Sequence, residues 1–116
     1  MNDCIYHNPR CSKSRQTLAL LQEHGVDLPI VEYLKDAPSA AELARICKLL
    51  GRAPLELIRR KEALFGELGL SADSGYSDAQ WCEVMAANPK LIERPIVVYN
   101  GRAAIGRPPE AVLALL

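Results

Sequence analysis

The first third of the chain reads as a strand, a helix and a second strand, and this order constrains the fold more than any other feature. Residues 3–6 form a short apolar run that stops at Asn8-Pro9, so we expect a buried first strand ending in a turn. Leucines recur at helical spacing between Cys11 and His24, and Gly25 suits a left-handed helix end. Residues 29–34 predict a second strand. A unit of this kind predicts two parallel strands with a right-handed crossover.

The middle of the chain predicts helices only. Capping-box patterns at 39–42 and 77–80 each open an amphipathic stretch, and Pro54 opens a shorter one. A further short helix is expected over 64–70. The loop between these pieces is too short to be a domain linker.

The last third returns to strands. Residues 96–99 and 102–105 flank Asn100-Gly101, which predicts a hairpin with two positive φ angles in its turn. A last helix should follow Pro108-Pro109, with Val112, Leu115 and Leu116 facing inward. The order predicts one α/β domain over residues 1–116: a thioredoxin-like fold (βαβ plus ββα, a mixed four-stranded sheet) with an α-helical insertion at about 38–90. Pro95 stands where this architecture usually has a cis proline.

Charge and composition exclude several classes of function. The 116 residues contain 14 Lys+Arg and 14 Asp+Glu, so no overall field attracts nucleic acid or a membrane surface. No signal peptide and no apolar run of membrane length is visible, and we expect a cytoplasmic monomer. The four cysteines form no C-x-x-C pair, a spacing that suits neither a disulfide scaffold nor a zinc site, and we expect no metal and no bound cofactor.

Cys11 is the candidate nucleophile. It stands where the first helix should begin, with Arg10, Lys13 and Arg15 nearby, and helix N-termini and cations both favour a thiolate. The alternative is a small buried hydrophobe, as free cysteines usually are. Ser14 occupies the position three residues on, so this C-x-x-S cannot close its own disulfide and needs an external thiol such as glutathione. The Ser14 hydroxyl could also donate a hydrogen bond to the thiolate.

His7 lies at the end of the first strand, four residues before Cys11. As an imidazolium it would favour the thiolate, as a neutral ring it could relay a proton, and it could equally be an ordinary turn histidine. A metal site there lacks further ligands. We expect Cys4, Cys47 and Cys82 to serve in packing.

Arginines recur at the predicted ends of elements. Arg94 precedes Pro95, Arg107 precedes Pro108, and Arg59 is followed by Arg60. A thioredoxin-like layout can bring Arg94 and Arg107 near the first helix start, where forked guanidinium groups would suit an oxyanion.

The chain resembles the glutaredoxin-coupled arsenate reductase family, in particular a small arsenate-reductase-like subgroup. The resemblance covers nearly the whole chain in order and lies in these segments: Tyr6-His7-Asn8-Pro9-Arg10-Cys11-Ser12-Lys13-Ser14-Arg15, Tyr33-Leu34-Lys35-Asp36-Ala37-Pro38-Ser39, Leu57-Ile58-Arg59-Arg60, Leu68-Gly69-Leu70, Asn88-Pro89-Lys90-Leu91-Ile92-Glu93-Arg94-Pro95-Ile96-Val97-Val98 and Gly106-Arg107-Pro108-Pro109-Glu110. It implies a catalytic Cys11 and an oxyanion site of Arg59, Arg94 and Arg107. To these we add His7 as a second catalytic candidate and Asn8 and Ser14 as candidate ligands of the oxyanion. Arg60 beside Arg59 leaves a one-residue ambiguity, in which the family pattern favours Arg59.

The same resemblance implies the reaction. Cys11 attacks arsenate, the arginines hold its oxygens, glutathione attacks the adduct as co-substrate, and glutaredoxin completes the reduction to arsenite. Two other functions share the fold: a redox-sensing regulator that binds RNA polymerase, and a monothiol oxidoreductase acting on glutathionylated proteins. Such regulators usually carry C-x-x-C as their switch, so Ser14 argues against the first.

Overall fold

The computed structural model describes residues 1–116, which form two compact units. Residues 1–36 and 94–116 make up the first, here called the sheet unit, and residues 37–93 make up the second, the helical unit. The sheet unit is therefore built from both ends of the sequence.

The sheet unit holds a four-stranded mixed sheet in the order β2-β1-β3-β4. Its strands are β1 (Cys4–His7), β2 (Ile30–Glu32), β3 (Ile96–Tyr99) and β4 (Arg102–Ile105). β1 runs parallel to β2 and antiparallel to β3, and β3 pairs with β4 as a hairpin. All four residues of β1 are buried, as expected for an apolar central strand. The predicted α/β class and mixed four-stranded sheet are confirmed.

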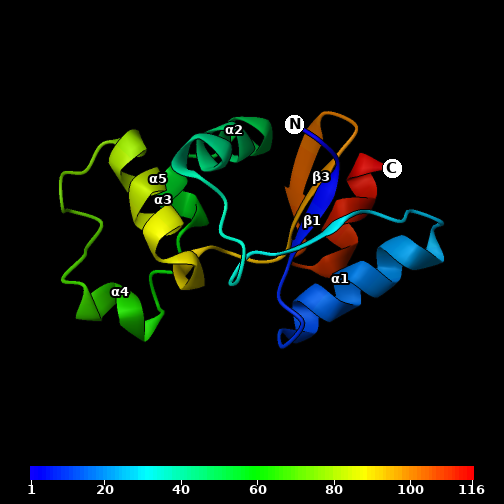
Figure 1. Ribbon diagram of the computed structural model, residues 1–116, viewed down its shortest axis with the longest axis horizontal. Coiled ribbons are helices and arrows are strands. Elements are labelled where there is room, and N and C mark those ends of the chain that lie inside the picture. Colours follow the sequence, from blue (N-terminus) through cyan, green and yellow to red (C-terminus); the bar gives the residue numbers. More distant parts are fainter. The chain divides into compact units, whose positions relative to one another are not determined.

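One face of this sheet carries a core made by α1 (Ser12–Glu23) and the 3₁₀ helix η2 (Pro109–Leu115). The two helices lie side by side against the sheet (Figure 1). Ile5 and Val97 pair across β1 and β3 and are fully buried, and the other buried members of the cluster are Leu21, Leu28, Val112 and Leu115.

The last helix departs from expectation in its geometry. It is a 3₁₀ helix, with three residues per turn, so Val112 and Leu115 fall on one line that faces the core. The prediction that Leu116 also faces inward was wrong: it lies off that line and is 47% exposed.

The hairpin turn agrees with its sequence. Asn100 and Gly101 have φ values of 56° and 76°, the pair of positive angles expected for an Asn-Gly turn. The peptide bonds Arg94–Pro95 and Arg107–Pro108 are both cis, the first at the place where the architecture usually has a cis proline.

The helical unit contains α2 (Ala40–Leu50), α3 (Pro54–Leu57), α4 (Ala63–Glu67), α5 (Asp78–Ala87) and the 3₁₀ helix η1 (Pro89–Leu91). Both predicted capping boxes form, Ser39 with Glu42 and Ser77 with Gln80. α2 and α5 pack on each other, and Trp81 of α5 stacks on Phe65 with ring centroids 6.2 Å apart. No helix in the structure is both long and apolar enough to cross a membrane.

Candidate active site

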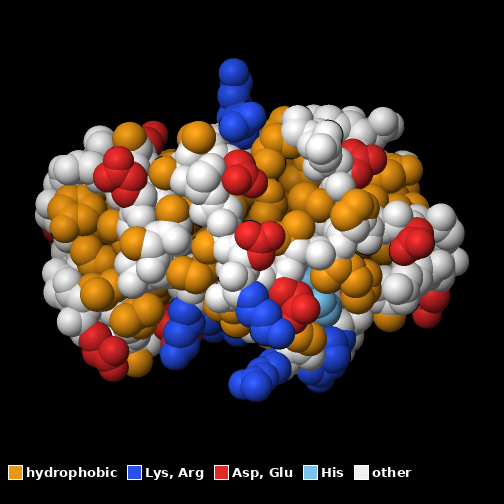
Figure 2. Space-filling model, in the orientation of Figure 1, with side chains coloured by type: hydrophobic (Ala, Val, Ile, Leu, Met, Phe, Trp, Pro, Cys, Tyr) orange, Lys and Arg blue, Asp and Glu red, His pale blue; other side chains and the backbone are white.

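The loop between β1 and α1 places Cys11 at the helix start. Cys11 is the N-cap residue of α1, with extended backbone (φ −93°, ψ 124°). Its N–H donates to the carbonyl oxygen of Asn8 at 3.0 Å, and the Asn8 side-chain oxygen accepts the N–H of Arg10 at 3.0 Å. Arg15 Nη1 donates to the Pro9 carbonyl at 3.0 Å. These bonds fold the loop into a tight turn, and basic side chains are exposed where it runs into α1 (Figure 2).

The surroundings of Cys11 favour its thiolate. Burial would raise the pKa of the thiol, but the backbone N–H groups of Ser14 and Lys13 and the guanidinium of Arg94 outweigh it, so the pKa lies below its ordinary value. The Arg94 side chain acts both as a hydrogen-bond donor to the sulfur and through its charge. This is the effect expected of a helix N-terminus combined with a neighbouring cation.

Arg107 reaches the same sulfur from the other end of the chain. Its Nη2 donates to Cys11 Sγ at 3.6 Å, and its Nε donates to the carbonyl oxygen of Arg94 at 2.7 Å. Cys11, Arg94 and Arg107 all belong to the sheet unit. The structure thus brings together the predicted nucleophile and two of the three predicted arginines.

Gly106 fixes the segment that carries Arg107, and the sequence reasoning missed it. A Cβ at this position would lie 2.7 Å from Cγ of Pro95 and closer still to Oγ1 of Thr17. Thr17 is fully buried on α1, and Gly106 N–H donates to the Pro95 carbonyl at 2.9 Å. The available signal was a glycine directly before the arginine at the end of a strand, which can mark a close backbone approach.

His7 and Ser14 form a pair beneath the loop. The Ser14 hydroxyl oxygen lies 2.7 Å from His7 Nδ1 and accepts the Asn8 N–H at 3.0 Å. The prediction that this hydroxyl donates to the Cys11 thiolate was wrong, because Ser14 is fully buried and its side chain is turned to His7. It is the backbone N–H of Ser14 that acts on the sulfur.

The surroundings of the His7 ring disfavour its charged form. It is only 6% exposed, and burial lowers its pKa; the charge of Glu32 raises the pKa, that of Arg15 lowers it, and the net direction is down. Of the roles expected from the sequence, this lowered pKa disfavours the imidazolium that would stabilise a thiolate and favours the neutral ring.

Arg59 belongs to the helical unit. Its backbone N–H donates to the Leu91 carbonyl at 2.7 Å, and its Nη1 forms a 2.9 Å ion pair with Glu62, which Lys90 also approaches at 3.3 Å. Glu62 is 17% and Arg59 25% exposed at the side chain, so this pair orients the guanidinium more firmly than a surface pair would. Arg60 is exposed.

The other three cysteines are buried and unbridged. Cys47 on α2 interacts with Cys82 on α5. Burial is the main cause that raises the pKa of Cys47 to about 12, and the neighbouring Cys82 contributes less. Burial likewise raises the pKa of Cys82. Cys4 packs within β1. These surroundings match the packing role expected for all three.

Comparison with known proteins identifies the family of this chain. The model of the ArsC family matches residues 6–115. The chain is 55% identical over 113 residues to the uncharacterized protein YfgD of Escherichia coli K12, covering 97% of this chain and 94% of that one. It is 46% identical over 113 residues to an arsenate reductase of Neisseria meningitidis, covering 97% and 96% of the two chains. Among solved structures, an arsenate reductase from Vibrio cholerae superposes with a TM-score of 0.93 at 51% identity, over 100% of this chain and 98% of that one. The fold is thus the thioredoxin-like fold of these neighbours, and the chain belongs to the ArsC family.

Proposed function

We propose that this protein reduces arsenate to arsenite, with Cys11 as the nucleophile and with glutathione and glutaredoxin as the electron donors. The observation that carries the proposal is the convergence of Arg94 and Arg107 on the Cys11 sulfur, whose pKa lies below its ordinary value. A thiolate beside two guanidinium groups can attack an oxyanion whose oxygens those groups hold. The relatives from N. meningitidis and V. cholerae carry the name arsenate reductase, which supports the choice of arsenate as the oxyanion.

The reaction balances with two external thiols. The Cys11 thiolate attacks arsenic, a sulfur–arsenic bond forms, and one arsenate oxygen leaves as water. The glutathione thiolate then attacks the arsenic, and a second oxygen leaves as water. A glutaredoxin thiolate attacks the glutathione sulfur and breaks its bond to arsenic, so that two electrons pass to arsenic and the two external sulfurs end as a disulfide. Water then cleaves the bond between arsenic and the Cys11 sulfur, which releases arsenite and restores Cys11. Because Ser14 replaces a second cysteine, the protein itself holds no resolving thiol.

The remaining site residues have supporting roles in this proposal. The neutral His7 ring relays a proton to the leaving oxygen, and Ser14 orients that ring through their 2.7 Å contact. The Asn8 side-chain oxygen accepts the N–H of Arg10, which leaves its amide NH₂ as a donor for the anion. Arg59 enters through the family resemblance, with Glu62 orienting its guanidinium. The arginines stabilise charge on the arsenic oxygens, most effectively in the transition state.

The test is a coupled assay on the purified protein. Arsenate, glutathione, glutaredoxin, glutathione reductase and NADPH are combined, and NADPH oxidation that depends on arsenate is measured beside the Cys11→Ser variant. We expect turnover in the wild type and none in the variant. Turnover of a glutathionylated peptide without any turnover of arsenate would instead identify a monothiol oxidoreductase and overturn the proposal.

A further inference from the structure

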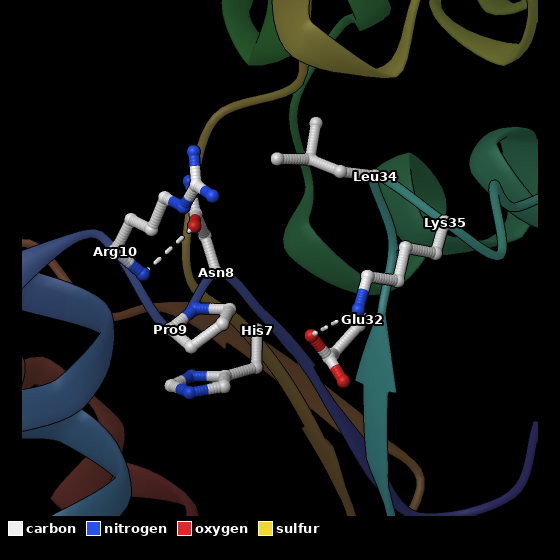
Figure 3. A pocket seen from close by; sticks show the side chains of 7 residues that line it. All are labelled: His7, Asn8, Pro9, Arg10, Glu32, Leu34 and Lys35. Carbon is white, nitrogen blue, oxygen red and sulfur yellow. Dashed lines mark hydrogen bonds and ion pairs between the residues drawn. The ribbon is translucent and has the colours of Figure 1, made fainter.

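A pocket of about 360 Å³ opens beside the nucleophile loop, within the sheet unit. Its walls are the segments that follow the two parallel strands β1 and β2, where His7 pairs with Glu32 (Figure 3). The lining residues are His7, Asn8, Pro9, Arg10, Glu32, Leu34 and Lys35. The carboxyl ends of parallel strands are where α/β folds commonly bind ligands, and the volume lies within the usual range for small-molecule sites.

The charges of this pocket come from opposite walls. Arg10 lies on the β1 side, and Glu32 and Lys35 lie on the β2 side (Figure 3). Lys35 Nζ is 3.7 Å from Glu32 Oε1, but their side chains are 81% and 45% exposed, so this ion pair is weak and leaves both groups open to a ligand. The guanidinium of Arg10 makes no hydrogen bond or ion pair with the protein, and only its backbone N–H is engaged. The pocket thus offers two cations and one carboxylate.

We infer that this pocket binds glutathione, and so places the tripeptide thiol beside Cys11. Glutathione at neutral pH carries two carboxylates and one ammonium group, the reverse of the pocket's charges in both sign and number. Arg10 and Lys35 would each receive a carboxylate, and Glu32 the ammonium of the γ-glutamyl end. Pro9 and Leu34 supply apolar surface for the peptide between these ends. An inorganic oxyanion would gain nothing from Glu32.

The position of the pocket suits the second chemical step. Arg10 directly precedes Cys11, and the Cys11 N–H is bonded to the carbonyl of Asn8, another pocket residue. A tripeptide anchored by its two ends on these walls presents its central cysteine to the loop that carries the nucleophile. The inference rests on the proposed function, in which glutathione attacks the arsenic bound to Cys11.

The binding of glutathione to the pocket is tested with an analogue that cannot react. Wild-type protein is titrated with S-methylglutathione, whose capped sulfur cannot react, and backbone amide NMR shifts are followed. We expect saturable shifts at Asn8, Arg10 and residues 32–35, and at least a tenfold weaker affinity for the double variant Arg10→Gln, Lys35→Gln. The matched control is Lys48→Gln, Arg52→Gln, which removes two exposed charges from the helical unit and should leave the affinity unchanged. Equal weakening by both double variants, or shifts elsewhere only, would overturn the inference.

The role of Glu32 is tested by changing the ligand together with the protein. The analogue of S-methylglutathione without its amino group should bind the wild type more weakly, and Glu32→Gln should bind both ligands equally. An amino-group preference that survives Glu32→Gln would refute the assignment of Glu32.

A kinetic arm separates this inference from the proposed function. In the arsenate assay, Arg10→Gln, Lys35→Gln should raise KM for glutathione about tenfold and leave KM for arsenate unchanged. If the wild type shows no arsenate turnover, the proposed function fails, and the titration alone still decides whether the pocket binds glutathione. If turnover is present and KM for glutathione does not change, the proposed function stands and the pocket assignment fails.

Discussion

Nη2 of Arg107 lies 3.6 Å from Sγ of Cys11, a residue 96 positions earlier in the chain. The same guanidinium donates from Nε to the carbonyl of Arg94 at 2.7 Å, so it is held at two points and faces the sulfur in a defined orientation. Cys11, at the start of α1 near the N-terminus, therefore has as a hydrogen-bond donor to its sulfur a side chain from near the C-terminus.

Arg107→Lys should weaken arsenate binding, because an ammonium keeps the charge but loses the planar fork. Loss of one charge-assisted hydrogen bond costs about 1.5–3 kcal/mol, so we expect kcat/KM for arsenate to fall about tenfold to a hundredfold. The control is Arg102→Lys in the same unit, whose side chain donates to the Ala114 carbonyl at 2.7 Å. An equal loss in both variants would show that the effect is not specific to the site.

Arg94→Gln should raise the pKa of Cys11, because the variant removes a hydrogen bond and a positive charge that act on the sulfur. Iodoacetamide labelling of Cys11 as a function of pH measures this, and the midpoint should move toward the ordinary thiol value of about 8.5. Since folding lowers this pKa, the thiolate stabilises the fold fully above the unfolded-state pKa, and this contribution is lost as pH falls through the folded pKa. The unfolding free energy of the wild type relative to Cys11→Ser should therefore rise with pH across that interval. An unchanged labelling midpoint in Arg94→Gln would contradict the assignment.

Ser14→Ala should destabilise the sheet unit. The variant removes the partner of the buried His7 Nδ1 and the acceptor of the part-buried Asn8 N–H, and an unsatisfied buried polar group costs about 1–3 kcal/mol. Urea unfolding measures the change. Ser12→Ala, at an exposed position two residues earlier, should change stability by less than about 0.5 kcal/mol. Equal stability of the two variants would mean that the His7–Ser14 pair does not hold the loop.

Gly106→Ala should destabilise the protein by about 1–3 kcal/mol, the usual cost of overpacking a filled interior. The added methyl group would meet Pro95 and Thr17, so α1 and the Arg107 segment must move apart. Gly66→Ala is the matched control, because a Cβ there has no atom within 4 Å and an alanine favours helix. Thermal unfolding of the two variants should shift Tm in opposite directions; a Gly106→Ala protein as stable as the wild type would contradict the close approach.

The four thiols should differ in reactivity. Brief iodoacetamide treatment at neutral pH should label Cys11 first, because Cys47 has a pKa raised to about 12 and Cys82 a raised pKa within the same packed helices. Peptide mass spectrometry reads the order of labelling, and unfolded protein should label at all four positions. Turnover should be lost in Cys11→Ser and retained in Cys4→Ser, Cys47→Ser and Cys82→Ser. Labelling of Cys82 as fast as Cys11 would contradict this order.

Local chemistry explains which parts of the fold could be predicted from the sequence. Asn100-Gly101 accepts positive φ at both positions, and Ser39 with Glu42 closes a capping box within four residues, so both features depend only on near neighbours. The 3₁₀ form of η2 did not show in the sequence, because apolar residues at 112 and 115 suit the spacing of either helix type.

The candidate site divides in the same way. Cys11 could be placed at a helix start from its surroundings in the sequence, whereas the orientation of the Ser14 hydroxyl depended on where the His7 ring lies once the strand is buried. Gly106 escaped notice because its steric role comes from Thr17 and Pro95, two residues distant in the chain. Sequence patterns therefore indicate which side chains are reactive. They do not show the tertiary contacts that orient those side chains.

The division of the sheet unit between residues 1–36 and 94–116 has a consequence for synthesis. The ribosome makes Cys11 long before Arg94 and Arg107, and β1 has no antiparallel partner until β3 has been made. We therefore expect the thiol of a nascent chain to behave as an ordinary cysteine, mostly protonated near neutral pH and slow to react. Its activation waits for the completion of the fold, so an incomplete chain does not expose the nucleophile in its reactive form to the electrophiles and oxidants of the cell.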